Sequence, residues 1–392
     1  MLSNRFQSTN KVNLNSGVAI LKYNFEPLTY DYVIVNGVEY DNLYWEVNDD
    51  RAYTDENSSL FNGITYELGK DKELFYYSIY KDGFTVETVD FYRDGSVSKH
   101  ATGLVGARWK VEKWHPNGVY KEISYIWCGN EVAYKKWDEN GNLIDKRKWK
   151  EDICICASET MKKEICSQKM TEEECLNMQK YLKDYILQEA VLDKEDIKCI
   201  AGVDLAYWQE EDGEHAVCCI ALVDYNTHEV IERVHSAGII KFPYIAGYLA
   251  FRELPLVLET AGRLSIKPDI YMFDGNGILH PQMMGIATHA SFFLQRPTIG
   301  VAKSYYKINN TEFIMPDVKA GSFTDIVIDR QVLGRALRTM DNVQPVFVSS
   351  GNCIDLDSAV TLVMHMVGPE SHIPIPTREA DIDTHKARQK NK

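Results

Sequence analysis

Three features that would quickly assign a chain to a compartment or a ligand class are missing from this sequence of 392 residues. The first is a cysteine pattern typical of zinc sites or disulfides. The nine cysteines include no C-x-x-C pair, and the close pairs Cys154/Cys156 and Cys218/Cys219 do not have the spacing of a metal finger. Cys218 and Cys219 lie in an apolar run, so we expect them in a core. Reduced thiols are typical of the cytoplasm, because disulfides persist mainly in oxidising compartments.

Long hydrophobic runs are the second missing feature. No apolar stretch approaches the ~20 residues that cross a bilayer. Residues 1–27 hold no apolar segment like the core of a secretory signal. We therefore expect a cytoplasmic protein that does not associate with membranes.

An excess of positive charge is the third missing feature. Lysine and arginine number 43 against 57 aspartates and glutamates, which gives a formal net charge of −14. Non-specific binding to nucleic acid comes almost entirely from basic side chains on phosphates. The chain is therefore not predicted to bind DNA or RNA indiscriminately. It could still act on nucleic acid through a local groove that is basic or filled with metal, so the expected contact is selective and metal-assisted.

The first half of the chain, residues 1–150, predicts an all-β domain. Aromatic and β-branched residues alternate there with polar ones between turn signals. Residues 1–75 are expected to be a less regular β segment of this domain, and they contain no recognisable chemistry. The turn signals are six Asn-Gly or Asp-Gly pairs, which favour tight hairpins and begin at Asn36, Asn62, Asp82, Asp94, Asn117 and Asn140.

Internal repeats mark residues 75–150. The motif aromatic-x-x-Asn/Asp-Gly begins at Phe91, Trp114 and Trp137, in steps of 23 residues. We expect each unit to be one hairpin whose aromatic residue packs on the next unit; an exposed aromatic binding face is the alternative. The pattern resembles MORN-like hairpin repeats. That resemblance allows a module for binding a protein partner, for targeting or for immunity, with the partner unknown.

Residues 151–171 are predicted to form a helical connector between two domains. Residues 159–188 are rich in helix formers and contain neither proline nor glycine. Thr171 and Glu174 have the spacing of a capping box, which would open a helix that runs to about Gln188. The second domain is therefore expected over residues 172–392.

The second domain alternates between predicted strands and helices, an order that indicates the α/β class with a mixed sheet flanked by helices. Strands are predicted at 200–207, 216–224, 229–235, 270–273, 298–302 and 345–349, and helices at 247–264 and 282–294.

Asp204 and Asp274 are the most informative residues of this domain. Each lies at the polar end of a short apolar run, Ile200-Ala-Gly-Val-Asp204 in one case and Ile270-Tyr-Met-Phe-Asp274 in the other. A carboxylate at the end of a buried strand is costly unless something pairs with it. Two such strands side by side would place both carboxylates on one divalent cation, Mg²⁺ or Mn²⁺. This arrangement is typical of sites that cleave phosphodiester bonds.

Six segments of residues 172–385 together resemble the endonuclease V family. Within them, Ala201-Gly-Val-Asp204, Asp274-Gly-Asn-Gly277 and Pro376-Thr-Arg-Glu-Ala-Asp381 occur in the family's order. The other segments are 242–253, 297–304 and 332–339. The resemblance implies a ribonuclease-H-like fold. It also implies that Asp204, Glu253 and Asp274 bind a metal ion, and that Asp381 helps a second metal ion or orients water.

Further roles follow from the same resemblance. His280 would lie near the scissile phosphate or a metal-bound water, and Lys303 would neutralise phosphate charge. Taken alone, each has a plainer interpretation: a lone Glu253 on a helix is usually solvated, a lone histidine is usually structural, and a lysine at a strand end usually faces solvent.

The resemblance also implies a way to read the substrate. Tyr244 would belong to a wedge that separates the strands beside the lesion. Gly247, Gly275 and Gly285 would let backbone amides approach an extruded base, although ordinary turn or packing glycines are the alternative. The sequence departs from the family at two positions, with Ala246 in place of proline at the end of the wedge and Asn276 in place of histidine. These changes affect the rigidity with which the wedge separates the strands and the detail of the loop, and they leave the metal site intact.

The function that the sequence predicts is a metal-dependent endonuclease, with Mg²⁺ as cofactor and Mn²⁺ as a substitute. It would cut DNA, with RNA left open, at the second phosphodiester bond 3′ to deoxyinosine or inosine, in the repair of deaminated adenine. The alternative is a nucleic-acid-binding or regulatory protein that keeps a weakened nuclease domain for binding.

Overall fold

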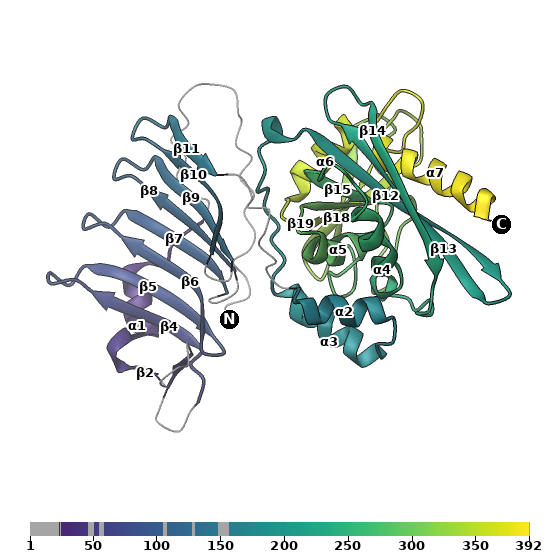
Figure 1. Ribbon diagram of the computed structural model, residues 1–392. Helices are drawn as coiled ribbons and strands as arrows, with labels where there is room; N and C mark the ends of the chain where they lie inside the picture. Colours follow the sequence, from purple (N-terminus) through teal and green to yellow (C-terminus); the bar gives the residue numbers. More distant parts are fainter. Residues whose placement is uncertain are drawn as a thin grey trace. The chain divides into compact units, whose positions relative to one another are not determined.

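The computed structural model describes residues 23, 25–45, 51–54, 59–104, 108–127, 130–147 and 157–391. Cys154 and Cys156 lie outside these residues. The chain divides into two compact units, Met1–Arg147 and Lys148–Lys392 (Figure 1). Among the described residues, no helix is both long enough and apolar enough to cross a membrane.

A nine-stranded sheet dominates the first unit, with its strands in the order β1-β4-β5-β6-β7-β8-β9-β10-β11. From β4 onward each strand pairs antiparallel with the next, whereas β1 is parallel to β4. The strands are β1 (Gly37–Glu39), β4 (Gly63–Leu68), β5 (Leu74–Lys81), β6 (Phe84–Phe91), β7 (Val97–Leu104), β8 (Arg108–Trp114), β9 (Tyr120–Trp127), β10 (Asn130–Trp137) and β11 (Leu143–Arg147). A separate pair is β2 (Tyr44–Trp45) with β3 (Ala52–Tyr53).

The expectation of β structure alone was wrong near the N-terminus. Helix α1 (Tyr30–Asn36) begins after Thr29, whose side chain accepts a hydrogen bond from the backbone of Tyr32 as a helix cap. Val33 of this helix is buried in the core beside the first strands.

Four of the six predicted turns form as expected. Asp82 and Gly83 both have positive φ, 51° and 79°, between β5 and β6. The glycines Gly95, Gly118 and Gly141 have φ of 81° to 83° and close the next three hairpins of this type. Asn36 and Asn62 do not form hairpins. Asn36 ends α1, where its side chain donates to the carbonyl of Tyr32, and Asn62 accepts a hydrogen bond from the backbone of Asp82.

The aromatic residues of the repeats pack between units, as expected. Trp114 is 1% exposed and stacks on Tyr120, which in turn contacts Trp137. Hydrogen bonds also join successive repeats. The hydroxyl of Tyr92 donates to the backbone carbonyl of Trp114, and the ring of His115 contacts the backbone carbonyl of Trp137. These aromatic rings therefore belong to the repeat core. The likeness to MORN repeats stays a prediction.

The second unit contains an eight-stranded mixed sheet with the order β14-β13-β12-β15-β16-β19-β18-β17. The antiparallel strands β12 (Cys199–Glu210), β13 (Gly213–Asp224) and β14 (Val230–Ile239) form the predicted meander, and β15 (Ile270–Phe273) and β16 (Thr298–Ala302) continue parallel to β12. The sequence did not predict β17 (Phe323–Ile328) or β18 (Gln331–Leu337), which pair antiparallel beside β19 (Val346–Asn352).

Helices cover both faces of this sheet (Figure 1). On one face lie α4 (Leu249–Ala261) and α5 (Ile286–Leu294), and on the other α6 (Leu356–His365) and α7 (Ile375–Asn391). Adjacent residues of a strand point to opposite faces. Accordingly Cys219 packs in a cluster with Ala387 of α7, while Cys218 lies beside Thr260 of α4. Both cysteines are buried, as predicted.

Helix α2 (Glu159–Ser167) lies in the predicted connector, and helix α3 (Glu172–Lys183) begins the predicted second domain. The predicted capping box of Thr171 and Glu174 is present, but α3 ends at Lys183 and not near Gln188. Helix α5 also begins later than predicted, because Gly285 donates to the carbonyl of Gly277 and Met283 has a positive φ.

Candidate active site

Three aspartates from different elements come together at one end of the central parallel strands. Asp204 lies within β12, and Asp274 directly follows β15, its parallel neighbour. The backbone N–H of Asp274 donates to the carbonyl of Val203, which brings the two carboxylates side by side. Asp381 comes from α7. Ligand atoms of the three side chains all lie within 4.8 Å of one another.

Glycine makes the approach of α7 possible. A Cβ atom on Gly202 would lie 1.9 Å from the carbonyl carbon of Pro376, so only glycine lets the start of α7 rest against β12 at this point. The helix then carries Asp381 over the strand that holds Asp204. Thr384, one turn further on, donates to Oδ2 of Asp204 over 2.8 Å.

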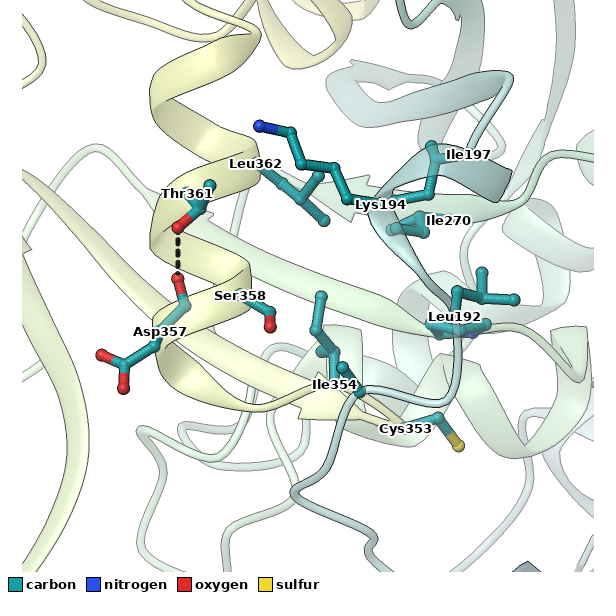
Figure 2. Close-up of a pocket in the computed structure, with 12 residues that line it drawn as sticks. Leu192, Lys194, Ile197, Ile270, Cys353, Ile354, Asp357, Ser358, Thr361 and Leu362 are labelled. Atoms are coloured by element: carbon teal, nitrogen blue, oxygen red, sulfur yellow. Dashed lines mark hydrogen bonds between the residues drawn. The ribbon is translucent and has the colours of Figure 1, made fainter. Parts of the chain in front are cut away.

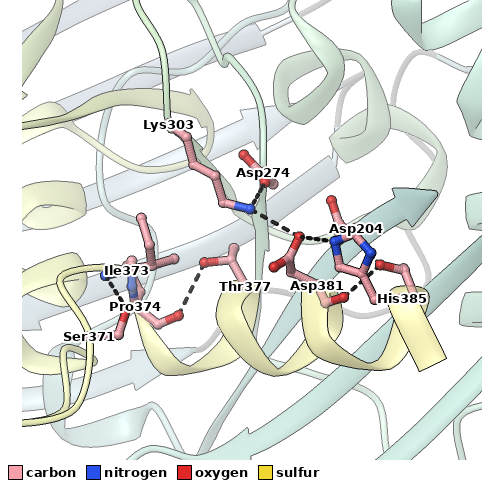
Figure 3. A network of polar contacts seen from close by, with 10 residues as sticks. Asp204, Asp274, Lys303, Ser371, Ile373, Pro374, Thr377, Asp381 and His385 are labelled. Carbon is pink, nitrogen blue, oxygen red and sulfur yellow. Dashed lines mark hydrogen bonds and ion pairs between the residues drawn. The ribbon is translucent and has the colours of Figure 1, made fainter.

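Lys303 joins the aspartates from the end of β16. Its Nζ lies 2.7 Å from Oδ2 of Asp274 and 3.1 Å from Oδ1 of Asp381 (Figure 3). On the other side of Asp381, Nε2 of His385 lies 3.7 Å from the same Oδ1 atom. Lys303 is thus paired with the acidic group and does not simply face solvent.

Burial and the neighbouring charges shift the pKa values of the side chains in this group. Burial, together with the neighbouring Asp274, raises the pKa of Asp204 to about 7. Burial also raises the pKa of Asp274, although Lys303 opposes the shift. For Lys303, burial lowers the pKa but the ion pairs with Asp274 and Asp381 outweigh it, so the net shift is upward. Partly buried carboxylates this close repel one another, and a cation among them relieves the repulsion. Three carboxylates are also the hard oxygen ligands that divalent cations prefer. The group could therefore hold a metal ion.

Glu253 lies near this group without joining it. It is 9% exposed on α4, and its Oε1 accepts a hydrogen bond of 2.5 Å from the hydroxyl of Tyr207. Burial raises the pKa of Glu253 to about 7, against the hydrogen bond from Tyr207, which lowers it. Asp204 points toward α7, and Tyr207, three residues later, points toward α4, where it meets Glu253. The third member of the close group is Asp381.

His280 is buried, and both of its ring nitrogens are engaged. Its Nδ1 accepts from the backbone N–H of Gln282 over 3.1 Å, so Nε2 carries the proton and donates to the carbonyl of Gly247 over 3.0 Å. Burial lowers the pKa of His280 to about 4. In this structure the neutral ring ties residue 247 to the 280–284 loop. A contact of His280 with a phosphate or a metal-bound water stays a prediction.

The segment predicted to form a wedge projects into solvent, since Tyr244 is 73% exposed. Gly247 follows it with φ of 89°. Gly275 and Gly285 are close-packed glycines: a Cβ on Gly275 would lie 2.6 Å from Ile286, and one on Gly285 would lie 2.3 Å from the carbonyl oxygen of Asn276. The backbone at these two positions therefore has no room for a side chain. Asn276 itself has a buried Oδ1 with no hydrogen-bond partner among the residues that the structure describes.

Four residues around the site were not predicted from the sequence, and three of them had a signal in the sequence. Thr384 and His385 follow Asp381 at helical spacing of three and four residues, which places them on one face. Tyr207 follows Asp204 by three positions on a strand, which places it on the opposite face. Arg252 carried no signal beyond its position next to Glu253.

Two other features lie apart from the aspartates. An apolar cavity of about 200 Å³ is lined by Leu192, Ile270, Ile354 and Leu362 among others (Figure 2). Ile270 begins β15, whereas Asp274 follows its end, so the cavity is at the other end of that strand. A second group of close ligand atoms, from Glu210, Asp212 and His215, lies at the turn between β12 and β13.

Comparison with known proteins agrees with this geometry. Residues 180–382 match the family model of endonuclease V. Endonuclease V from Bacillus thuringiensis subsp. konkukian is 55% identical over 218 residues, which are 56% of this chain and 93% of that protein. The crystal structure of Bacillus subtilis endonuclease V matches with a TM-score of 0.56 and 49% identity, over 57% of this chain and 97% of that one.

A further structure shows a relative with nucleic acid. Ciona intestinalis endonuclease V, in complex with a 24mer DNA containing an inosine followed by a ribo-adenosine, matches with a TM-score of 0.50 and 26% identity, over 56% of this chain and 98% of that one. The family model spans the site from Asp204 to Asp381. The chain therefore belongs to the endonuclease V family and is a nuclease, a hydrolase that acts on nucleic acid.

Proposed function

We propose that this protein is a metal-dependent endonuclease that cuts strands containing deoxyinosine or inosine at the second phosphodiester bond 3′ to the lesion. The observation that carries the proposal is the group of Asp204, Asp274 and Asp381 with Lys303 beside it. The inosine-containing DNA bound by the Ciona relative supports the choice of substrate. A ribonuclease-H-like assignment of the nuclease unit is part of the proposal.

The residues fit a divalent cation. Asp204, Asp274 and Asp381 would hold Mg²⁺, or Mn²⁺ in its place, with Glu253 as a further ligand. Bound there, the ion would stabilise negative charge on the phosphate and lower the pKa of an attacking water.

Side chains of the protein would supply a positive charge and the hydrogen bonds that hold the site in place. Lys303 brings a positive charge to the edge of the acidic group, where an ammonium can stabilise charge that develops on a phosphate oxygen. His280 holds residue 247 and the 280–284 loop in place by hydrogen bonds to both. Thr384 orients the carboxylate of Asp204.

Recognition of the lesion is assigned to the loops beside this site. The exposed ring of Tyr244 would stack at the position that an extruded base leaves, and the base would enter next to Gly247, Gly275 and Gly285. We assign nuclease activity to residues 172–392, with 151–171 as connector. Residues 1–150 are a separate β domain for a protein partner.

Oligonucleotides with one deoxyinosine or one inosine, and matched strands with adenine, test the function. Cleavage is measured with Mg²⁺, with Mn²⁺ and with EDTA, beside the Asp204→Ala protein. The expected product is cut one nucleotide beyond the lesion, only with metal and only by the wild type. Equal cutting of the adenine strands, or full activity of Asp204→Ala, would contradict the proposal. The ratio of DNA to RNA cleavage assigns the preferred strand.

A further inference from the structure

Tyr207 and Glu253 form a buried contact on the face of the sheet opposite Asp204. The tyrosine hydroxyl donates to Oε1 of Glu253 over 2.5 Å, and Glu253 is almost fully buried. A phenol donates a hydrogen bond without carrying a charge. It therefore fixes the plane of the carboxylate and leaves both its negative charge and its second oxygen available.

Arg252 holds the tyrosine ring in place. Its guanidinium carbon lies 4.7 Å from the centre of the Tyr207 ring. The guanidinium is itself anchored at two points, over 2.6 Å to Oε2 of Glu214 and over 2.8 Å to the carbonyl of Phe242. The ring is thus confined between β12 and α4, so Tyr207 cannot turn away from Glu253 without breaking these contacts.

Besides burial, the charges of Asp204 and Asp274 raise the pKa of Glu253. Its charge and those of Asp204 and Asp274 repel one another, although its oxygens lie outside the close group of three. Tyr207 holds one of its two oxygens, so this hydrogen bond sets the direction of the other oxygen. The orientation of this carboxylate therefore needs a support.

We propose that Tyr207 is a positioning residue that holds the Glu253 carboxylate toward the cation site of Asp204, Asp274 and Asp381. The inference rests on the proposed metal-dependent function, and it adds Tyr207 to the residues that support the cation site. Groups that orient a ligand in this way typically change metal affinity by about 10–100-fold when removed.

Binding of Mn²⁺ to the full chain, measured by calorimetry without nucleic acid, tests the proposal. Tyr207→Phe keeps the ring under Arg252 and removes only the hydroxyl, so it is expected to stay folded and to weaken Mn²⁺ binding about 10-fold. Tyr225→Phe is the matched control. The hydroxyl of Tyr225 is also buried but has no hydrogen-bond partner in the described part of the chain, so its loss should leave Mn²⁺ affinity unchanged.

A double-mutant cycle shows whether Tyr207 acts through Glu253. Glu253→Gln alone should weaken Mn²⁺ binding, and adding Tyr207→Phe should weaken it no further. Thermal melts of each variant confirm that the unit is folded. A Tyr207→Phe protein with wild-type affinity would overturn the proposal. So would the same 10-fold loss in the Glu253→Gln background, because Tyr207 would then act by another route.

Failure of the proposed function gives a different result. A wild-type protein that binds Mn²⁺ through Asp274 but leaves inosine strands intact would contradict the nuclease substrate and leave the role of Tyr207 standing. A wild-type protein with no Mn²⁺ site that depends on Asp274 would overturn both.

Discussion

The ammonium group of Lys303 lies 2.7 Å from Oδ2 of Asp274, at the edge of a group of three aspartates. The lysine offsets part of the negative charge that a divalent cation would otherwise neutralise. It therefore competes with a cation for the same carboxylates.

Replacing Lys303 by Met should separate these two roles. Cleavage of a deoxyinosine strand should fall by about 10²–10³-fold, because a positive charge near the phosphate is lost. Mn²⁺ should bind as tightly as before or more tightly, because the carboxylates lose a competing cation. Single-turnover cleavage and calorimetry measure the two effects, and a variant that loses Mn²⁺ binding would show that Lys303 supports the cation instead.

The dependence on pH follows from two buried acids. The pKa values of Asp204 and Glu253 are raised to about 7 from 3.8 and 4.5. Because the folded-state pKa values lie above those of the unfolded chain, their contribution to stability is full below about pH 4 and is lost as pH rises through 7. A cation restores it by offsetting the ionised carboxylates. Mn²⁺ should therefore raise the melting temperature more at pH 8 than at pH 5.5, and equal shifts at both pH values would contradict these assignments.

Tyr244 should affect the substrate step and not stability. Its side chain is 73% exposed, so Tyr244→Ala is expected to keep the melting temperature. Loss of one stacking contact should slow cleavage of a duplex with deoxyinosine by about 10-fold. A single strand with the same lesion needs no strand separation and should be affected less. The rate ratio of duplex to single strand is the measurement, and an equal loss on both would argue against a wedge.

Trp114 tests the repeat unit. It is almost fully buried among aromatic neighbours, so Trp114→Ala should destabilise residues 23–147 by about 3–5 kcal/mol. Calorimetric melting should show a lower transition for this unit alone, with cleavage of inosine strands retained. A parallel loss of cleavage would mean that the nuclease depends on the repeats.

The strands that carry Asp204 and Asp274 could be predicted from the sequence, because a short apolar run that ends in an acid indicates a buried strand with a carboxylate at its end. It did not reach β17 and β18, whose outward-facing residues mix apolar and polar side chains and leave no clear pattern. Their role in the sheet depends on pairing with β19, which is a long-range contact.

The membership of the acidic group was harder to predict than its existence. Asp381 reaches it only because Gly202 lets α7 lie on β12, a contact between residues far apart in the chain. Glu253 of α4 meets Tyr207, which strand alternation turns toward that helix. His280 is engaged by the backbone of its own loop, which depends on how residues 280–284 turn.

The most direct test of the account is a crystal structure grown with Mn²⁺ and measured at the manganese absorption edge. A cation held by the aspartates should give an anomalous peak at about 2.0–2.3 Å from carboxylate oxygens of Asp204 and Asp274, with Asp381 or Glu253 turned toward it. A peak only at Glu210, Asp212 and His215, or no peak beside Asp274, would contradict it.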